Sequence, residues 1–161
     1  MSSQKKAFSR REAIFTFSAT AVGAALLPLT HAQATEKGST VLNRTLVYAP
    51  SEMPTRKSPN GATVHEGFIG SLTTGERVDV HQTTLAAGRM PHPEKVHAET
   101  MIVMVRDGEI EFLMEGKVIR RMVAGDIAYS VPGQLHGLRN AGTTEANYFV
   151  IAIGHPDSKE G

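Results

Sequence analysis

Short apolar runs, separated at close intervals by turn-forming residues, constrain the fold of this sequence more than any other feature. At 109–112, acidic and apolar residues alternate, as in a strand that buries one face. Asp107-Gly108 and Glu115-Gly116 stand between such runs, and glycine adopts the positive φ of a tight hairpin without strain. An all-β sandwich or barrel is therefore predicted. Its eight expected strands are residues 41–48, 64–72, 77–85, 101–106, 109–114, 117–122, 126–130 and 147–153.

The first 34 residues have the three-part order of a secretory signal peptide. A basic segment, residues 1–12, precedes an uncharged apolar segment, residues 13–29, and Ala32-Gln33-Ala34 then suits a signal peptidase. The apolar segment is short for a membrane-spanning helix and is interrupted by Gly23 and Pro28. A cleaved signal is the prediction, and an uncleaved membrane anchor is the alternative.

Within this leader, Ser9-Arg10-Arg11-Glu12-Ala13-Ile14 resembles the twin-arginine export motif, which usually has phenylalanine where Ala13 stands. The resemblance implies that the protein folds in a bacterial cytoplasm and is then exported to the periplasm or beyond. This route often serves to load a metal or cofactor before export. We therefore expect a mature protein that works outside the cytoplasm and has no membrane segment.

Composition excludes several partners and chemistries. The chain has 17 Lys and Arg against 16 Asp and Glu, and four of the basic residues lie in the leader. Because no basic run remains in the rest of the chain, nucleic acid is not an expected partner. The chain has no cysteine, which excludes disulfide bonds, thiolate metal ligands and a thiol nucleophile.

Histidines and a carboxylate gather in the segment that leads into the predicted strand 101–106. His97 and Glu99 are two residues apart, so on an extended strand they point to the same face. His136 follows a Pro-Gly turn at the start of a further strand, and His92 lies between two prolines. Imidazoles and carboxylates together bind divalent transition metals. We therefore predict that His92, His97, Glu99 and His136 are metal ligands.

Two segments resemble the paired motifs of the cupin superfamily. The second motif is nearly complete, with Gly125, Pro132-Gly133, His136 and Asn140. In the first motif, His97 matches the second histidine of the family pattern. The resemblance covers residues 78–153 and implies a single cupin-type β-barrel, a double-stranded β-helix or jelly roll, that follows the signal peptide.

The first motif departs from the family pattern at two positions. Lys95 stands where the family has its first histidine, and Met101 stands where it has a glutamate ligand. His92 and Glu99 are chemically able to replace the missing pair. A cation at Lys95 disfavours a bound metal unless a carboxylate such as Glu99 offsets it. Lys95 and Met101 are therefore also candidates for contact with a small-molecule ligand.

The resemblance implies two functions, which the sequence leaves open. In the first, a divalent transition metal (Fe, Mn, Zn, Ni or Cu) and a small organic molecule bind inside the barrel of a dioxygenase, isomerase or lyase. In the second, the barrel binds a small molecule without metal or catalysis. Cupins often bind small acids, so Arg139 is a candidate to hold a carboxylate. Cupins also pair through edge strands, so a homodimer is expected, with 41–48 as the pairing strand.

The predicted organisation has four parts. Residues 1–34 are the signal peptide, and residues 35–62 are a flexible N-terminus, an edge strand and a loop rich in proline. Residues 63–155 are the cupin barrel, and residues 156–161 are a tail.

Overall fold

The computed structural model describes residues 40–155, and in this part the chain is almost entirely β-sheet. The leader and residues 156–161 lie outside the described residues, so the signal peptide stays a prediction. No helix among residues 40–155 is long and apolar enough to cross a membrane. One turn of 3-10 helix, η1 (Pro50–Glu52), precedes the strands. The strands are β1 (Thr55–Lys57), β2 (Ala62–Ser71), β3 (Arg77–Leu85), β4 (Lys95–Val96), β5 (Thr100–Asp107), β6 (Glu109–Met114), β7 (Lys117–Val123), β8 (Ile127–Ser130), β9 (Leu135–Asn140) and β10 (Ala146–Gly154).

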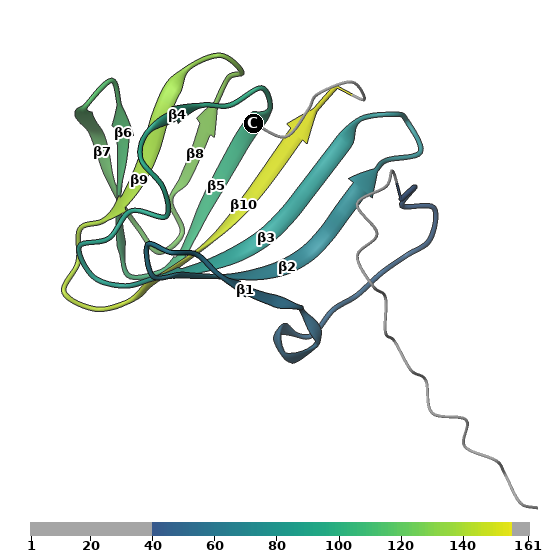
Figure 1. Cartoon of the computed structure of the whole chain (residues 1–161), viewed down its shortest axis with the longest axis horizontal. Helices are drawn as coiled ribbons and strands as arrows, with labels where there is room; N and C mark the ends of the chain where they lie inside the picture. Colours follow the sequence, from purple (N-terminus) through teal and green to yellow (C-terminus); the bar gives the residue numbers. More distant parts are fainter. Residues whose placement is uncertain (1–39, 156–161) are drawn as a thin grey trace, which may run out of the picture. The chain divides into compact units, whose positions relative to one another are not determined.

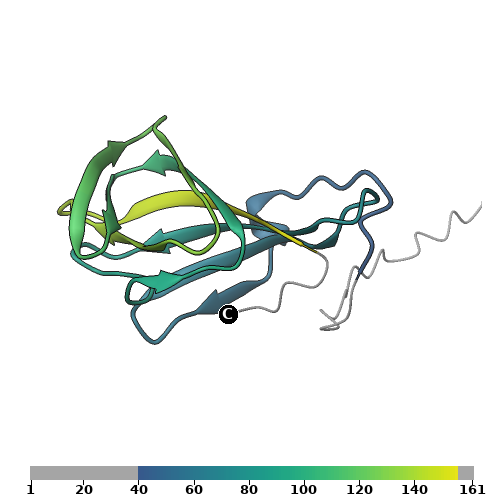
Figure 2. The same cartoon turned by 90° about the horizontal axis from the view of Figure 1, so that it is seen from above.

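These strands form two sheets within residues 40–155, of six strands in the order β1-β2-β3-β10-β5-β8 and of four in the order β4-β9-β6-β7. All the pairs between named strands are antiparallel. From β4 to β10 the chain passes repeatedly from one sheet to the other, and the smaller sheet curves over the end of the larger one that carries β5 and β8 (Figures 1 and 2). This is the jelly-roll arrangement, and the predicted all-β barrel is confirmed.

The core lies between the two sheets, on faces defined by strand alternation. On β10, Ala146, Tyr148 and Val150 are buried at alternate positions. On β6 of the facing sheet, Ile110 and Phe112 are buried in the same way and pack in the same cluster. The phenol of Tyr148 is 1 % exposed, and this burial raises its pKa above the ordinary value of 10.0. The alternation of buried residues along β10 and β6 therefore shows which face of each sheet points to the core.

Of the two predicted hairpin turns, the one between β6 and β7 closes a hairpin, whereas the one at Gly108 joins β5 to β6, which lie in different sheets and do not pair. Gly108, between β5 and β6, has φ 79°, and a Cβ there would lie 2.8 Å from Ala146, so no other residue fits. Between β6 and β7, Glu115 and Gly116 both have positive φ, 51° and 77°, which is the geometry of a type I′ turn. Glycine is therefore required at position 108, and the turn between β6 and β7 holds Glu115 in a strained backbone conformation.

The N-terminal part differs from the sequence prediction. Residues 41–48 form no strand; Val41 makes only an isolated bridge to Ser71, supported by the bond from Leu42 N to Ser71 O at 2.8 Å. Val47 is 85 % exposed, so this segment has no sheet against which to bury alternate residues. The prediction of an edge strand at 41–48 is wrong, and the short β1 forms the edge next to β2 instead.

Candidate functional site: a cluster of imidazoles in the barrel

His136 lies at the start of β9 on the inner face of the smaller sheet. Gly133, with φ 82°, turns the chain into this strand, as the Pro-Gly pair predicts. The side chain is buried, and its Nδ1 lies 3.0 Å from Gln134 O and 3.1 Å from Ser130 Oγ. Because a carbonyl only accepts hydrogen bonds, Nδ1 carries a proton, and in the neutral ring the lone pair is then on Nε2.

His92 and His97 come to His136 from the segment before β5. The ring centroids of His97 and His136 are 4.9 Å apart, and those of His92 and His97 are 5.6 Å apart. His92 Nδ1 donates to Pro93 O at 2.7 Å, which again leaves Nε2 with a lone pair. The ring of Phe112 also stacks on that of His136, with the two centroids 5.6 Å apart and the two planes at 6°. The structure thus brings together three of the four predicted metal ligands.

Burial and neighbouring charges keep two of these imidazoles neutral. The pKa of His97 is lowered from 6.5 to about 4, first by burial and then by the charge of Lys95 and the nearby His136 and His92. Burial is also the main cause that lowers the pKa of His92. A neutral imidazole is the form that binds a metal, so near pH 7 both rings have a free lone pair.

The spacing of the rings agrees with shared coordination of one ion. A metal about 2.1 Å from a ring nitrogen lies about 3.2 Å from that ring's centroid, so two ligands at about 90–120° have centroids about 4.5–5.5 Å apart. The two centroid separations are close to this range. However, no three His, Asp or Glu side chains within residues 40–155 form a group already arranged to hold a metal. The donor chemistry fits, and the rings would have to reorient on binding.

Lys95 lies on the same inner face as these rings. β4 pairs with β9 so that Lys95 is directly opposite His136, and opposed residues of an antiparallel pair share a face. Its charge contributes to the lowered pKa of both His97 and His92. The ammonium group therefore favours neutral imidazoles and opposes a bound cation, as the sequence suggests.

Glu99 and Met101 take different places. Residues 97–99 lie between β4 and β5 and outside any strand, so strand alternation does not align Glu99 with His97 as we expected. Its role as a ligand stays a prediction. Met101 is on β5, directly opposite Ser130 on β8, and packs against the core cluster. Because Ser130 bonds His136, Met101 lies on the barrel wall near the imidazoles.

Arg139 does not lie where the sequence interpretation expects it. On β9, His136, Leu138 and Asn140 are buried at alternate positions, so Arg139 is on the outer face. It forms two hydrogen bonds with Glu111 Oε2, one of them at 2.8 Å from Nε. The expectation that Arg139 holds the carboxylate of a ligand in the barrel is therefore corrected: the guanidinium is on the outer face and is bonded to Glu111.

Two residues that touch His136 are missing from the sequence prediction. Phe112 is a buried residue of the alternating run in β6, so the pattern predicts that it points inward, but it does not predict its stacking on His136. Ser130 is the last residue of β8 and is 3 % exposed. A serine at a strand end carries no signal of this kind, because the contact depends on how β8 and β9 approach.

The two-sheet jelly roll is an architecture that includes the cupins. The family model for the cupin domain matches residues 81–152, and the described residues have the cupin-type jelly-roll fold. No curated relative matches the sequence.

Several solved structures share this fold. An RmlC-like cupin from Shewanella frigidimarina is 13 % identical, with a TM-score of 0.58, and the match covers 71 % of this chain and 95 % of that one. A predicted oxalate decarboxylase from Thermotoga maritima is 23 % identical, with a TM-score of 0.53, over 67 % and 98 % of the two chains. An oxalate oxidase in complex with glycolate is 25 % identical, with a TM-score of 0.54, over 71 % and 61 %.

Proposed function

We propose that the barrel binds a divalent transition metal through His92, His97 and His136 and acts on a small organic molecule beside it. The observation that carries this proposal is the gathering of three imidazoles from distant parts of the chain, with separations of 5.6 Å and 4.9 Å between neighbouring centroids. Two of them have Nδ1 bound to a carbonyl, which leaves Nε2 available. Glu99 is the proposed fourth ligand.

The protein residues would hold the site as follows. Gln134 O and Ser130 fix the tautomer and orientation of His136, and Phe112 covers one face of its ring and excludes water from it. A bound Fe, Mn, Zn, Ni or Cu ion would supply Lewis acidity or a site for dioxygen. The reaction classes that we propose are those of a dioxygenase, an isomerase or a lyase, and the predicted oxalate decarboxylase among the similar structures supports the lyase class.

Metal content after purification without a histidine tag tests the proposal. For the wild type, we expect elemental mass spectrometry to find about one equivalent of a transition metal per chain. In His136→Ala the metal content should be at least about tenfold lower, because one of three ligands is removed. His65→Ala is the matched control, since His65 lies on β2 next to the buried Val64 and on the opposite face. Absence of metal in the wild type even after incubation with each of the five ions would overturn the proposal.

The alternative is a barrel that binds a small molecule without a metal. The specific observation in its favour is Lys95, which lies directly opposite His136 on the inner face. In that case, a chelator would leave the melting temperature of the protein unchanged. If the first proposal holds, the chelator lowers the melting temperature, because an ion that binds only the folded state stabilises it.

Export and self-association are further proposals. The leader residues Ser9–Ile14 and the apolar segment 13–29 support export through the twin-arginine route to the periplasm or beyond. A homodimer is supported by an exposed apolar area on the outer face of β5 and β8, where Met104 lies opposite Ile127 and Tyr129 is 65 % exposed. Sedimentation velocity measures the oligomeric state; a purely monomeric protein at high concentration would overturn the dimer.

A further inference from the structure

A cavity of about 340 Å³ opens between the edge of β7 and β8. Its inner wall is formed by Phe112, Met114 and Ala128, which also pack in or against the core. Its outer part includes Arg120 and Tyr129. Cavities of this size hold small molecules, and a mostly apolar wall with a few polar groups is typical of such sites.

Arg120 is directed to this cavity by the strand register. In the pairing of β6 with β7, Ile110 lies opposite Met122 and Phe112 lies opposite Arg120. Since Ile110, Phe112 and Met122 are buried on the inner face, Arg120 is on that face too, at its exposed edge. Among residues 40–155, no carboxylate or carbonyl bonds the Arg120 guanidinium. The cavity is therefore lined by an inward arginine whose guanidinium has no hydrogen-bond acceptor in the described part of the chain.

The neighbouring arginine shows the contrast. Arg121 is on the outer face, where its guanidinium lies 3.1 Å from Glu109 Oε2 and donates to Ala141 O at 2.9 Å. Asp126, the carboxylate that lines the cavity, accepts the bond from Val123 N at 2.9 Å and so holds the turn between β7 and β8. The guanidinium of Arg121 is thus bonded by protein groups, whereas the guanidinium of Arg120 is available to bond a ligand.

The cavity adjoins the imidazole cluster through two shared walls. Phe112 lines the cavity and stacks on His136, and Met114 lines it and lies directly opposite His136 in the pairing of β6 with β9. A molecule bound by Arg120 would therefore lie beside the residues that contact the cluster. This place suits the substrate of the proposed site.

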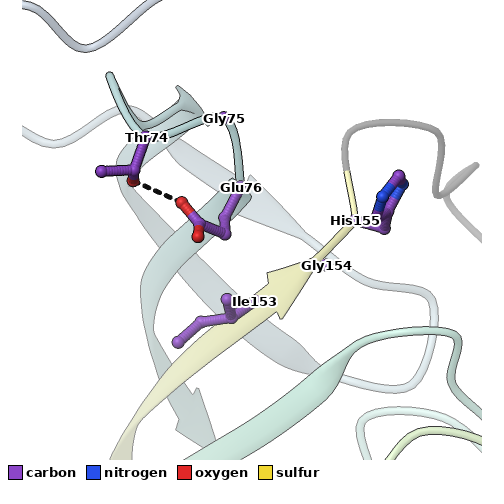
Figure 3. Close-up of a pocket in the computed structure, with 6 residues that line it drawn as sticks. All are labelled: Thr74, Gly75, Glu76, Ile153, Gly154 and His155. Carbon is purple, nitrogen blue, oxygen red and sulfur yellow. Dashed lines mark hydrogen bonds between the residues drawn. The ribbon is translucent and has the colours of Figure 1, made fainter.

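Another cavity, of about 390 Å³, has no such chemistry. It lies at the turn between β2 and β3 and the end of β10, where Thr74 Oγ1 donates to the carboxylate of Glu76 (Figure 3). Its other lining residues are Gly75, Ile153, Gly154 and His155, and none of them belongs to the imidazole cluster.

We propose that the cavity between β7 and β8 binds a small carboxylate with an apolar body, and that Arg120 holds the carboxylate. The apolar part would lie against Phe112 and Met114, and the guanidinium offers two parallel N–H donors that match a carboxylate. That this carboxylate is the substrate rests on the proposed function. That the cavity binds a carboxylate rests on Arg120 and not on the metal.

Benzoate and its neutral analogue benzamide are suitable probes, because they have nearly the same size and shape and differ in charge. Titration calorimetry of the purified protein should give benzoate at least about tenfold tighter binding than benzamide, the value expected for a charge-assisted pair. Arg120→Gln should remove this preference, and Arg120→Lys should keep only part of it, since lysine keeps the charge and loses the paired donors. Arg121→Gln, one residue away on the outer face, should leave the preference intact.

Three results would overturn the inference: equal binding of benzoate and benzamide, no binding of benzoate up to about 10 mM, or an equal loss in Arg121→Gln. Metal content measured on the same samples keeps the two proposals separate. Loss of the benzoate preference in Arg120→Gln with unchanged metal supports the inference, whereas a wild type that prefers benzoate but binds no metal overturns the metal proposal alone.

Discussion

Asn140 is the residue on which the end of the barrel most depends. It is fully buried, and its Nδ2 donates to Leu85 O and Thr144 O, both at 2.8 Å, while Oδ1 accepts from Gly142 N at 2.9 Å. The amide thereby ties β3 and β9 to the turn before β10. It is part of the second cupin motif, but its role here is structural, because it bonds only to backbone groups.

Asn140→Ala should lower the free energy of unfolding by about 2–4 kcal/mol, because it leaves buried backbone groups without partners. Urea denaturation followed by circular dichroism measures the change. Asn43→Ala removes an exposed amide and should change the free energy of unfolding by less than about 0.5 kcal/mol. Equal effects of the two substitutions would contradict this account.

At the scale of single residues, the sequence predicts chemistry better than direction. His97 and His136 are candidate ligands by type and motif and His92 by type alone, and the structure brings the three rings together. For Arg139 the sequence gives the chemistry but not the direction. The side chain is on the outer face because Arg139 lies between two inward residues of β9. A shift of one residue reverses the face of every side chain on a strand, so direction needs the register.

The hairpin between β6 and β7 is the element in which local sequence and local geometry disagree. Met114 pairs with Lys117, so Glu115 and Gly116 form a two-residue turn with positive φ at both positions. Asparagine adopts this conformation more easily than glutamate does, and Asn-Gly is the preferred pair for a type I′ turn.

Glu115→Asn should therefore raise the free energy of unfolding by about 0.5 kcal/mol. Thermal or urea denaturation measures this gain. Glu115→Ala removes the same carboxylate and keeps a Cβ without the local bonding of asparagine, so it should give no gain. A loss of stability in Glu115→Asn would show that the glutamate side chain has a role that its conformation does not reveal.

Most of the strands follow from the pattern of the sequence. The runs 77–85 and 109–114 agree with β3 and β6 to the residue, because alternation and flanking glycines determine strands with one buried face. The two residues of β4 carry no pattern of their own, and this strand exists only because Lys95 and Val96 pair with β9. Residues 41–48 have the composition of a strand, but they make only one bridge.

At the scale of the whole molecule, the twin-arginine leader makes a prediction about location. Replacing Arg10 and Arg11 together by lysine should leave most of the precursor in the cytoplasm of a bacterial host, because the export machinery recognises the arginine pair. Cell fractionation and immunoblotting measure this. Replacing Lys5 and Lys6 by arginine keeps the charge outside the motif and should allow export; equal export of both variants would count against this route.

By itself, the sequence determined the class of fold, the turn positions and the residue types of the candidate site, because these depend on short-range patterns of polarity and backbone freedom. Only the tertiary structure decided which side chains meet. His97 lies outside any strand and reaches His136 only because β4 pairs with β9, while Arg120 and Arg121 have opposite faces only through the register of β7. Contacts between distant strands depend on register and packing, and a single local segment contains neither.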